Sequence, residues 1–397
     1  MQMYRLSGFL KWLAGSLLAI AVLTGLIFLQ NPKAKVNSIP LPGPLGNLSA
    51  TPEASHIQNL LVEITDSKQQ FVVGSLLLNT GDKSVLAPLD PNVVVDLRVF
   101  GLRDLHGATN QTSSGQILEA FNVGSGMSID GILNLSQIGL GGLLDDIGGV
   151  SVNVPEELTL PRASNDEPQT LPVGRVKLDG ATAAAYAIYR RPGESVTEQS
   201  ARFLPVLTAA LDSLPKNAQA INSRLASLGQ SGTSNLTDLE IANYLARTSG
   251  TWSKATTLRI STEPSQLRPK SKPNWLWLNP TNLYSDLLRV QPQALWLSDP
   301  NKLRITVSSV NPSGRLAVRQ HLSRGNLYFV DGGGTSPSLK SHLLATDTVP
   351  SEVLDQIKAD LNLPDLDIQV VSQISTGTEL QLDLGMDFND QQFSGRN

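Results

Sequence analysis

Residues 129–154 read IDGILNLSQIGLGGLLDDIGGVSVNV, and residues 174–190 read GRVKLDGATAAAYAIYR. The first stretch predicts a strand, an amphipathic helix and a second strand. The helical spacing is carried by four apolar residues: Leu135, Ile138, Leu143 and Ile147. Gly148-Gly149 predicts the end of that helix, where a residue with positive φ is needed, and residues 150–154 alternate as a strand does. The second stretch predicts a strand and a short alanine-rich helix, so the pattern is that of an α/β protein.

Length and composition limit the possible classes of protein. The chain has 397 residues, which suggests two or three domains. The net charge is -4, and no long basic stretch interleaves with aromatic residues, so we expect no nucleic-acid partner. The absence of cysteine excludes disulfides, thiolate metal sites and a cysteine nucleophile. The four histidines lack metal-ligand spacing.

The N-terminal segment predicts a membrane anchor. Residues 12–29 carry no charge and are mostly apolar, and about 20 such residues cross a bilayer. No clear Ala-x-Ala cleavage site follows, so residues 1–30 are expected to be a retained signal-anchor helix with the bulk of the chain extracytoplasmic. The alternative is a buried core helix. Residues 31–55 are rich in proline and predict an extended stalk.

Two motifs in the central part resemble those of the LytR-CpsA-Psr family of cell-envelope proteins. The family typically has lVDalGGVdV followed by G.q.LdG.qALaYvR.R, and residues 144–152 and 178–190 match these in the same order. Strands predicted at 57–64, 71–78 and 84–88 follow the opening order of the family. The resemblance implies that residues 56–262 form a mixed sheet packed by helices.

The C-terminal part resembles a domain often appended to actinobacterial members of this family. Residues 307–314 and 380–387 resemble its opening and closing motifs, and strands and helices alternate between them. We therefore expect a small α/β domain over residues 301–390. Residues 263–300 contain several prolines and are expected to be the linker.

Family members of known activity transfer a glycopolymer from a polyprenyl-pyrophosphate carrier to peptidoglycan. The resemblance implies an apolar slot for the lipid and a mouth lined by arginines, whose guanidinium groups bind phosphate through two parallel hydrogen bonds. Mg²⁺ on the pyrophosphate is the implied cofactor, with no ligand set assigned. The catalytic positions of the family correspond here to Asp90, Arg190 and Arg202, and the expected ligand-binding residues are Asp66 and Arg191.

Several phosphate-binding positions of the family pattern are replaced in this chain. Arginine positions hold Leu89, Ile188 and Gln199, and the glutamine position holds Phe203. Each lost charged hydrogen bond removes about 1.5–3 kcal/mol. The replacements favour a degenerate member that binds a polyprenyl-phosphate lipid or a cell-wall polymer without chemistry. An active phosphotransferase and a non-catalytic scaffold for a protein partner are the alternatives, so the sequence leaves open whether the protein is an enzyme.

Overall fold

The computed structural model describes residues 57–80, 83–161, 168–296, 301–322 and 327–389. The expected signal-anchor and stalk lie outside these residues. Among the described residues, no helix combines the length and apolar character needed to cross a membrane.

A mixed six-stranded sheet lies at the centre of the family-like region. Its spatial order is β11-β6-β1-β2-β3-β12. The bounds are β1 Asn59–Thr65, β2 Phe71–Asn79, β3 Ser84–Leu89, β6 Gly131–Ser136, β11 Gly232–Ser234 and β12 Thr256–Thr257. Strand β1 pairs antiparallel with β2 and parallel with β6, so the sheet is mixed, as the sequence predicts. The first three strands also match their predicted positions, within the usual uncertainty at strand ends.

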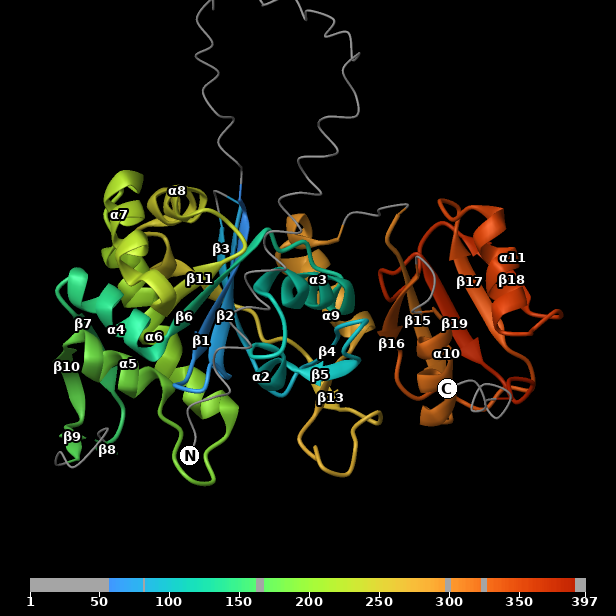
Figure 1. Ribbon diagram of the computed structural model, residues 1–397, viewed down its shortest axis with the longest axis horizontal. Helices are drawn as coiled ribbons and strands as arrows, with labels where there is room; N and C mark the ends of the chain where they lie inside the picture. Colours follow the sequence, from blue (N-terminus) through green and yellow to red (C-terminus); the bar gives the residue numbers. More distant parts are fainter. Residues whose placement is uncertain (1–56, 81–82, 162–167, 297–300, 323–326, 390–397) are drawn as a thin grey trace, which may run out of the picture. The chain divides into compact units, whose positions relative to one another are not determined.

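Helices cover both faces of this sheet (Figure 1). The helices on one face are α4 Gln137–Asp146, α5 Gly180–Ile188, α6 Val196–Ser213, α7 Ala218–Leu228 and α8 Asp238–Thr248. Those on the other face are α2 Leu105–Ala108, α3 Ser114–Ser125 and α9 Pro280–Val290. Successive side chains of a strand point to opposite faces, so Leu60 and Val62 belong to the first core and Leu61 to the second. Burial on both faces explains why β1 is an almost continuous apolar run.

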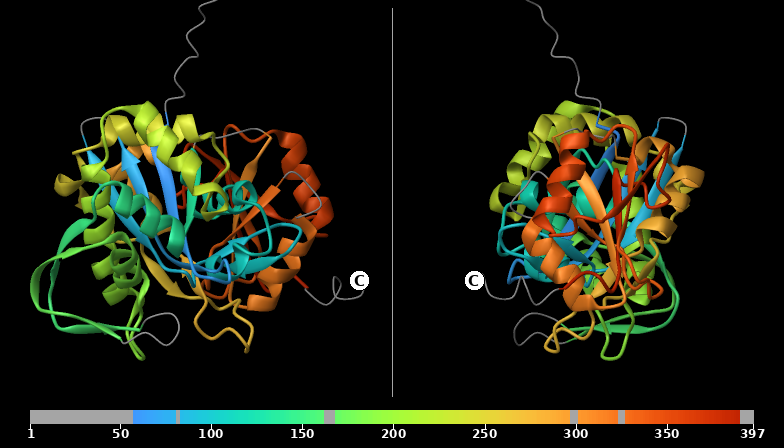
Figure 2. Two further views of the ribbon diagram at one scale, coloured as in Figure 1. Left: turned by 60° about the vertical axis from the view of Figure 1, so that its left-hand side comes forward. Right: turned by 90° about the vertical axis from the view of Figure 1, so that its right-hand side faces the viewer.

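Two antiparallel strand pairs follow α4 and are seen as green ribbons in Figure 2. Strand β7 Val150–Val154 pairs with β10 Gly174–Leu178, and β8 Leu158–Leu160 pairs with β9 Gln169–Leu171. The predicted alternation in β7 is confirmed, since its three valines are buried and the residues between them exposed. Strands β8 and β9 belong to the folded body, because their leucines reach the first core.

The helix at 137–146 exists as predicted, but one of its apolar residues faces solvent. Ile138 is 80% exposed, whereas Leu140, Leu143 and Leu144 are buried. The helix starts after its N-cap Ser136, which places Ile138 in the first turn, away from the sheet. At the other edge of the sheet, β12 pairs with β3, and the backbone N–H of Leu258 continues this pairing by donating to the Leu86 carbonyl.

The segment expected to be a linker, 263–300, contains ordered elements. Strands β13 Thr262–Pro264 and β14 Leu276–Leu278 form a hairpin, and α9 follows. Leu278, Leu283 and Leu287 are buried in the second core, next to the hairpin of β4 Val94–Asp96 and β5 Leu102–Asp104. Apolar side chains at these positions explain why the segment packs instead of remaining extended; the domain boundaries themselves stay a prediction.

The C-terminal region has its own sheet and its own core. The strand order is β16-β15-β19-β17-β18. The bounds are β15 Leu303–Ser309, α10 Pro312–Leu322, β16 Leu327–Asp331, β17 His342–Thr346, α11 Ser351–Asp360, β18 Asp367–Val371 and β19 Leu380–Leu384. Ile305, Val307 and Leu382 lie at the centre of this core. The region is therefore a small α/β unit, as the alternating pattern predicts.

Candidate functional site

Two cavities lie beside the N-terminal half of α6, where the second family motif ends. The first, of about 170 Å³, contains Arg191, Glu194 and Arg202, and we call it the Glu194 cavity. The second, of about 300 Å³, contains Asp90 and Arg259, and we call it the Asp90 cavity. Ala201 of α6 lines both cavities. The helix begins there because Ser195 and Glu198 form a capping box, which holds Glu194 just before the first turn.

A buried ion pair dominates the Glu194 cavity. The Arg202 guanidinium donates to both carboxylate oxygens of Glu194, with 2.8 Å between Nη2 and Oε2, and Nη2 also donates to the carbonyl of Tyr189. Arg202 and Glu194 are each only 7% exposed. This bidentate contact already uses the pair of N–H donors that the guanidinium group would otherwise offer to a phosphate. Arg202 is therefore paired with a carboxylate of the protein itself in this structure.

The neighbouring arginines also contact Glu194. The Arg191 side chain lies 2.5 Å from Glu156 and 3.6 Å from Glu194, and its backbone N–H donates to Glu194 Oε2. Arg190 is exposed, lines neither cavity, and donates from Nε to the Glu194 carbonyl at 2.9 Å. Three of the five residues predicted for the site are thus gathered around one acidic residue.

The electrostatics of the Glu194 cavity disfavour an additional anion. Its lining contains three carboxylates, from Glu156, Glu194 and Glu198, against the two guanidinium groups of Arg191 and Arg202. The hydrogen bond from Arg202 is the largest cause that lowers the pKa of Glu194, and the backbone N–H and charge of Arg191 lower it further despite burial. The hydrogen bond to Glu156 raises the pKa of Arg191. The cavity lining therefore holds one more carboxylate than guanidinium groups, so it offers no surplus cation to a phosphate.

The Asp90 cavity has a different chemistry. Its walls are mainly apolar, from residues such as Val93, Val196 and Leu204, with hydroxyl groups between them. Asp90 follows β3 and accepts hydrogen bonds at Oδ1 from the backbone and side chain of Asn92, both at 2.8 Å. Arg259 is exposed and forms no ion pair within the described residues. A carboxylate and a guanidinium group without an ion-pair partner thus line an otherwise apolar cavity.

The other predicted positions lie away from both polar clusters. Asp66 follows β1 and accepts backbone hydrogen bonds from Lys68 and Gln70, so its carboxylate shapes a turn outside both cavities. Phe203 is fully buried in the first core. Gln199 is also buried and donates to the carbonyl of Ile188 at 2.7 Å. Phe203 therefore serves packing, Gln199 holds the end of α5, and Leu89 lines the Asp90 cavity.

No preformed metal site stands out. Among the described residues, no three His, Asp or Glu side chains are grouped so as to hold an ion. The glutamates of the Glu194 cavity contact arginines or cap α6, which makes them poor ligands. Asp90 Oδ2 is a better candidate, because Mg²⁺ at phosphate sites uses one or two carboxylates and completes its shell with substrate oxygens and water. The magnesium expectation stays a prediction.

Sequence reasoning missed Glu194 and Arg259. Glu194 could have been found from its spacing, since an acidic residue occurs three residues after Arg191 and eight before Arg202. Arg259 gave no local signal, because it lies in neither of the two family motifs. Its place in the Asp90 cavity depends on the pairing of β12 with β3.

Comparison with known proteins agrees with the motifs. Residues 115–276 match the model of the LytR_cpsA_psr family. No curated protein sequence matches the chain. TagV of B. subtilis is similar in structure, with a TM-score of 0.50, 16% identity, and coverage of 61% of this chain and 99% of TagV.

Two further solved structures are more distant. TagT bound to LIIa-WTA has a TM-score of 0.45 and 15% identity, and the match covers 59% of this chain and 90% of TagT. The LytR-Csp2A-Psr enzyme from Actinomyces oris has a TM-score of 0.43 and 18% identity, and covers 60% of this chain and 91% of the enzyme. The fold is thus similar to that of TagV, and the resemblance to the LytR-CpsA-Psr family is confirmed by the match over residues 115–276.

Proposed function

We propose that this protein takes part in cell-envelope assembly by binding a polyprenyl-(pyro)phosphate-linked glycopolymer without transferring it. The family match over residues 115–276 supports a role with such a carrier. The observation that carries the non-catalytic part is the bidentate ion pair between Arg202 and Glu194. Arg202, predicted to be catalytic, and Arg191, predicted to bind the ligand, already contact carboxylates of the protein.

The energetics support this proposal. Separating a buried ion pair so that one charge is left unpaired costs about 3–5 kcal/mol. A pyrophosphate entering the Glu194 cavity would have to displace Glu194 from Arg202 and would also meet the charge of Glu156. Catalysis requires cationic groups placed in advance where negative charge develops. In this chain the Glu194 carboxylate occupies the position beside Arg202 where the phosphate would bind.

Binding of the carrier is assigned to the Asp90 cavity. Its apolar walls suit the first isoprene units, and Arg259 at the exposed side suits the phosphate. Asp90 would hold a magnesium ion on the pyrophosphate through Oδ2. The protein itself provides one guanidinium group for the phosphate, which is enough for recognition but fewer than the several arginines that the family pattern implies for transfer.

We further propose that residues 1–30 anchor the protein in the membrane and that the described region faces outward. The apolar run at 12–29 supports the anchor. An anchored binding protein would meet its lipid carrier at the membrane surface.

The test is binding of polyprenyl pyrophosphate with Mg²⁺, followed by thermal shift on the purified chain. We expect a shift that is reduced in Arg259→Gln and Asp90→Asn and unchanged in Arg268→Gln, an exposed arginine elsewhere. Loss of a single charged hydrogen bond predicts roughly tenfold weaker binding. A shift insensitive to both cavity variants would contradict the assignment, and the absence of any shift would favour the scaffold alternative.

An active phosphotransferase is the second candidate, supported by Asp90 and Arg259 lining one cavity. It predicts cleavage of the pyrophosphate bond that is lost in both cavity variants. Binding without cleavage would count against it.

A further inference from the structure

Gly332 and Gly334 follow β16 and help to line an open groove of about 450 Å³. The groove lies between the β13–β14 hairpin, the start of α9 and the C-terminal sheet. Its volume falls within the range of about 300–1,000 Å³ typical of small-molecule sites. It shares no lining residue with the Glu194 or Asp90 cavity.

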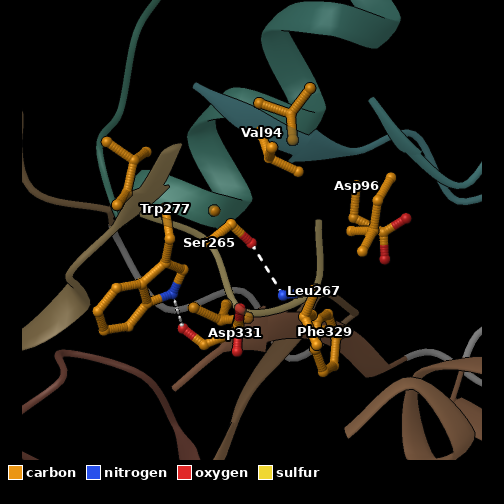
Figure 3. A pocket seen from close by; sticks show the side chains of 12 residues that line it. Val94, Asp96, Ser265, Leu267, Trp277, Phe329 and Asp331 are labelled. Atoms are coloured by element: carbon orange, nitrogen blue, oxygen red, sulfur yellow. Dashed lines mark hydrogen bonds between the residues drawn. The ribbon is translucent and has the colours of Figure 1, made fainter. Parts of the chain in front are cut away.

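Trp277 forms a fixed aromatic wall of this groove. Its indole Nε1 donates to the carbonyl of Asp331 at 2.5 Å, as Figure 3 shows from the side of a smaller cavity that Trp277 also lines. Gly333 has φ +76°, and a Cβ there would lie 3.1 Å from the Trp277 ring. Glycine therefore permits both the backbone conformation and the close approach of the indole.

The neighbouring glycines keep polar side chains accessible. A Cβ on Gly332 would lie 2.3 Å from Ser308 Oγ, and one on Gly334 would lie 3.2 Å from Gln266 Nε2. Because the wall lacks side chains at these positions, the hydroxyl and amide groups behind it remain beside the open volume.

Gln266 is held in a defined orientation by a buried arginine. Arg315 is fully buried and donates from Nη2 to Gln266 Oε1 at 3.0 Å. Nη1 of Arg315 donates to the carbonyls of Ser309 and Gly333, and Nε lies 2.9 Å from Asp331 Oδ1. This network fixes the acceptor of Gln266 and leaves its NH₂ group as a donor toward the groove.

The remaining lining is polar and almost uncharged. It includes the amides of Asn279, Asn282 and Gln381 and the hydroxyls of Ser375 and Thr376. Glu263 is the single acid of the lining, it accepts from Asn279 at 2.9 Å, and no lysine or arginine is among the groove residues. A groove without cations and with one carboxylate disfavours phosphates and other anions.

We propose that this groove binds an uncharged carbohydrate. Amide side chains offer donors and acceptors that match the paired hydroxyls of a sugar, and an indole face packs against the apolar C–H face of the ring. The site is independent of the carrier-binding proposal, because it uses other residues and recognises sugar rather than phosphate. Two sources share this chemistry: a neutral sugar segment of a glycopolymer, and an amino-sugar glycan strand.

The test uses the full chain labelled with 5-fluorotryptophan and followed by ¹⁹F NMR. The chain has five tryptophans, and Trp277→Phe assigns the resonance of Trp277. Chitotetraose represents the amino-sugar strand, maltotetraose the neutral polymer segment, and pyrophosphate the anion control. We expect at least one of the two sugars to shift the Trp277 resonance while the other tryptophan resonances stay in place. The sugar that binds more tightly identifies the source. Pyrophosphate should leave the Trp277 resonance unchanged.

Variants test whether binding occurs in the groove. We expect Trp277→Ala to weaken sugar binding about three- to tenfold and Asn282→Ala about two- to tenfold, while Gly334→Val, at an exposed position, blocks it. The matched amide control is Gln356→Ala on the exposed side of α11, which should bind as the wild type does. The proposal is overturned if neither sugar shifts the Trp277 resonance of the folded chain, or if binding survives in both Asn282→Ala and Gly334→Val.

Discussion

Two buried glutamates of the family-like region have pKa values shifted in opposite directions. Glu194 lies at the start of α6, where Arg202 lowers its pKa. Glu63 lies in the middle of β1, is fully buried, and neither carboxylate oxygen has a hydrogen-bond partner in the described part of the chain. Burial raises the pKa of Glu63 to about 8. The comparison shows that the partner, and not burial by itself, decides whether a carboxyl group keeps its charge inside this protein.

The difference bears on function. Glu194 keeps its charge and thereby occupies Arg202, whereas Glu63 is mainly neutral at pH 7 and holds no cation. Glu63 belongs to the face of the sheet that carries Leu61 and packs against α3, and it lines neither cavity. Variants at the two positions should therefore change stability in opposite directions.

The largest effect is expected from Glu194→Gln. Removing one partner of the buried pair leaves the Arg202 charge uncompensated and should destabilise the protein by about 3–5 kcal/mol. Chemical denaturation measures this loss. The double variant Glu194→Gln/Arg202→Met should recover most of it, because both charges are then absent. A loss below about 1 kcal/mol in the single variant would mean that the pair is not buried as described.

A change of opposite sign is expected from Glu63→Gln. At pH 7 the unfolded carboxyl is ionised, whereas the folded one, with a pKa of about 8, remains mostly protonated. Removing this ionisation should stabilise the protein on the order of 3 kcal/mol at pH 7. The same variant measured near pH 4 is its own control, because there the effect should nearly vanish. Destabilisation at pH 7 would show that the carboxyl has a favourable partner.

The two residues should also act at opposite ends of the pH range. The stability from Glu194, whose folded pKa is lowered, is present above its unfolded pKa of 4.5 and is lost as pH falls through the folded pKa. The stability associated with Glu63 is complete below pH 4.5 and is lost as pH rises toward 8. Each group contributes at most about 1.4 kcal/mol per pH unit.

Denaturation from pH 3 to 9 measures the free energy of unfolding along both the acid limb and the alkaline limb of its pH dependence. Glu63→Gln should flatten the alkaline limb, and Glu194→Gln/Arg202→Met the acid limb. If either variant altered the other limb instead, the assignment of the two glutamates would be wrong.

The smallest effect is expected from Glu198→Gln, which extends the comparison to an exposed glutamate. Glu198 lines the same cavity as Glu194 but accepts from the Ser195 backbone N–H, a bond that glutamine can also accept. Its replacement should leave the free energy of unfolding nearly unchanged, as is usual for an exposed side chain. A larger loss would indicate that Glu198 shares the role of Glu194.

The sequence predicts the central elements because their signals are local. The alternation in β7 and the apolar run of β1 each depend on neighbouring residues, and the structure contains both. The exposure of Ile138 and the packing of 263–300 depend on which surface a helix or hairpin meets, which periodicity does not encode. Tertiary contacts decide those cases.

The candidate site was predictable in composition but not in arrangement. Arg202, predicted from the family motif, and Arg191, predicted to bind the ligand, do meet in one cavity. Their pairing with Glu194 was not predicted, because it brings together a loop and a helix across a capped turn. Arg259 and Asp90 are separated by most of the family-like region and meet through the pairing of β12 with β3.

The most direct test of the central claim is the fate of polyprenyl pyrophosphate mixed with the purified chain and Mg²⁺. Binding is followed by thermal shift, and cleavage of the pyrophosphate bond is followed by release of phosphate. The account predicts a shift that depends on Arg259 and no cleavage above the background without protein. Cleavage by the wild-type chain that is lost in Arg202→Ala or Arg190→Ala would contradict it, because these arginines would then act on the substrate and not merely pair with Glu194.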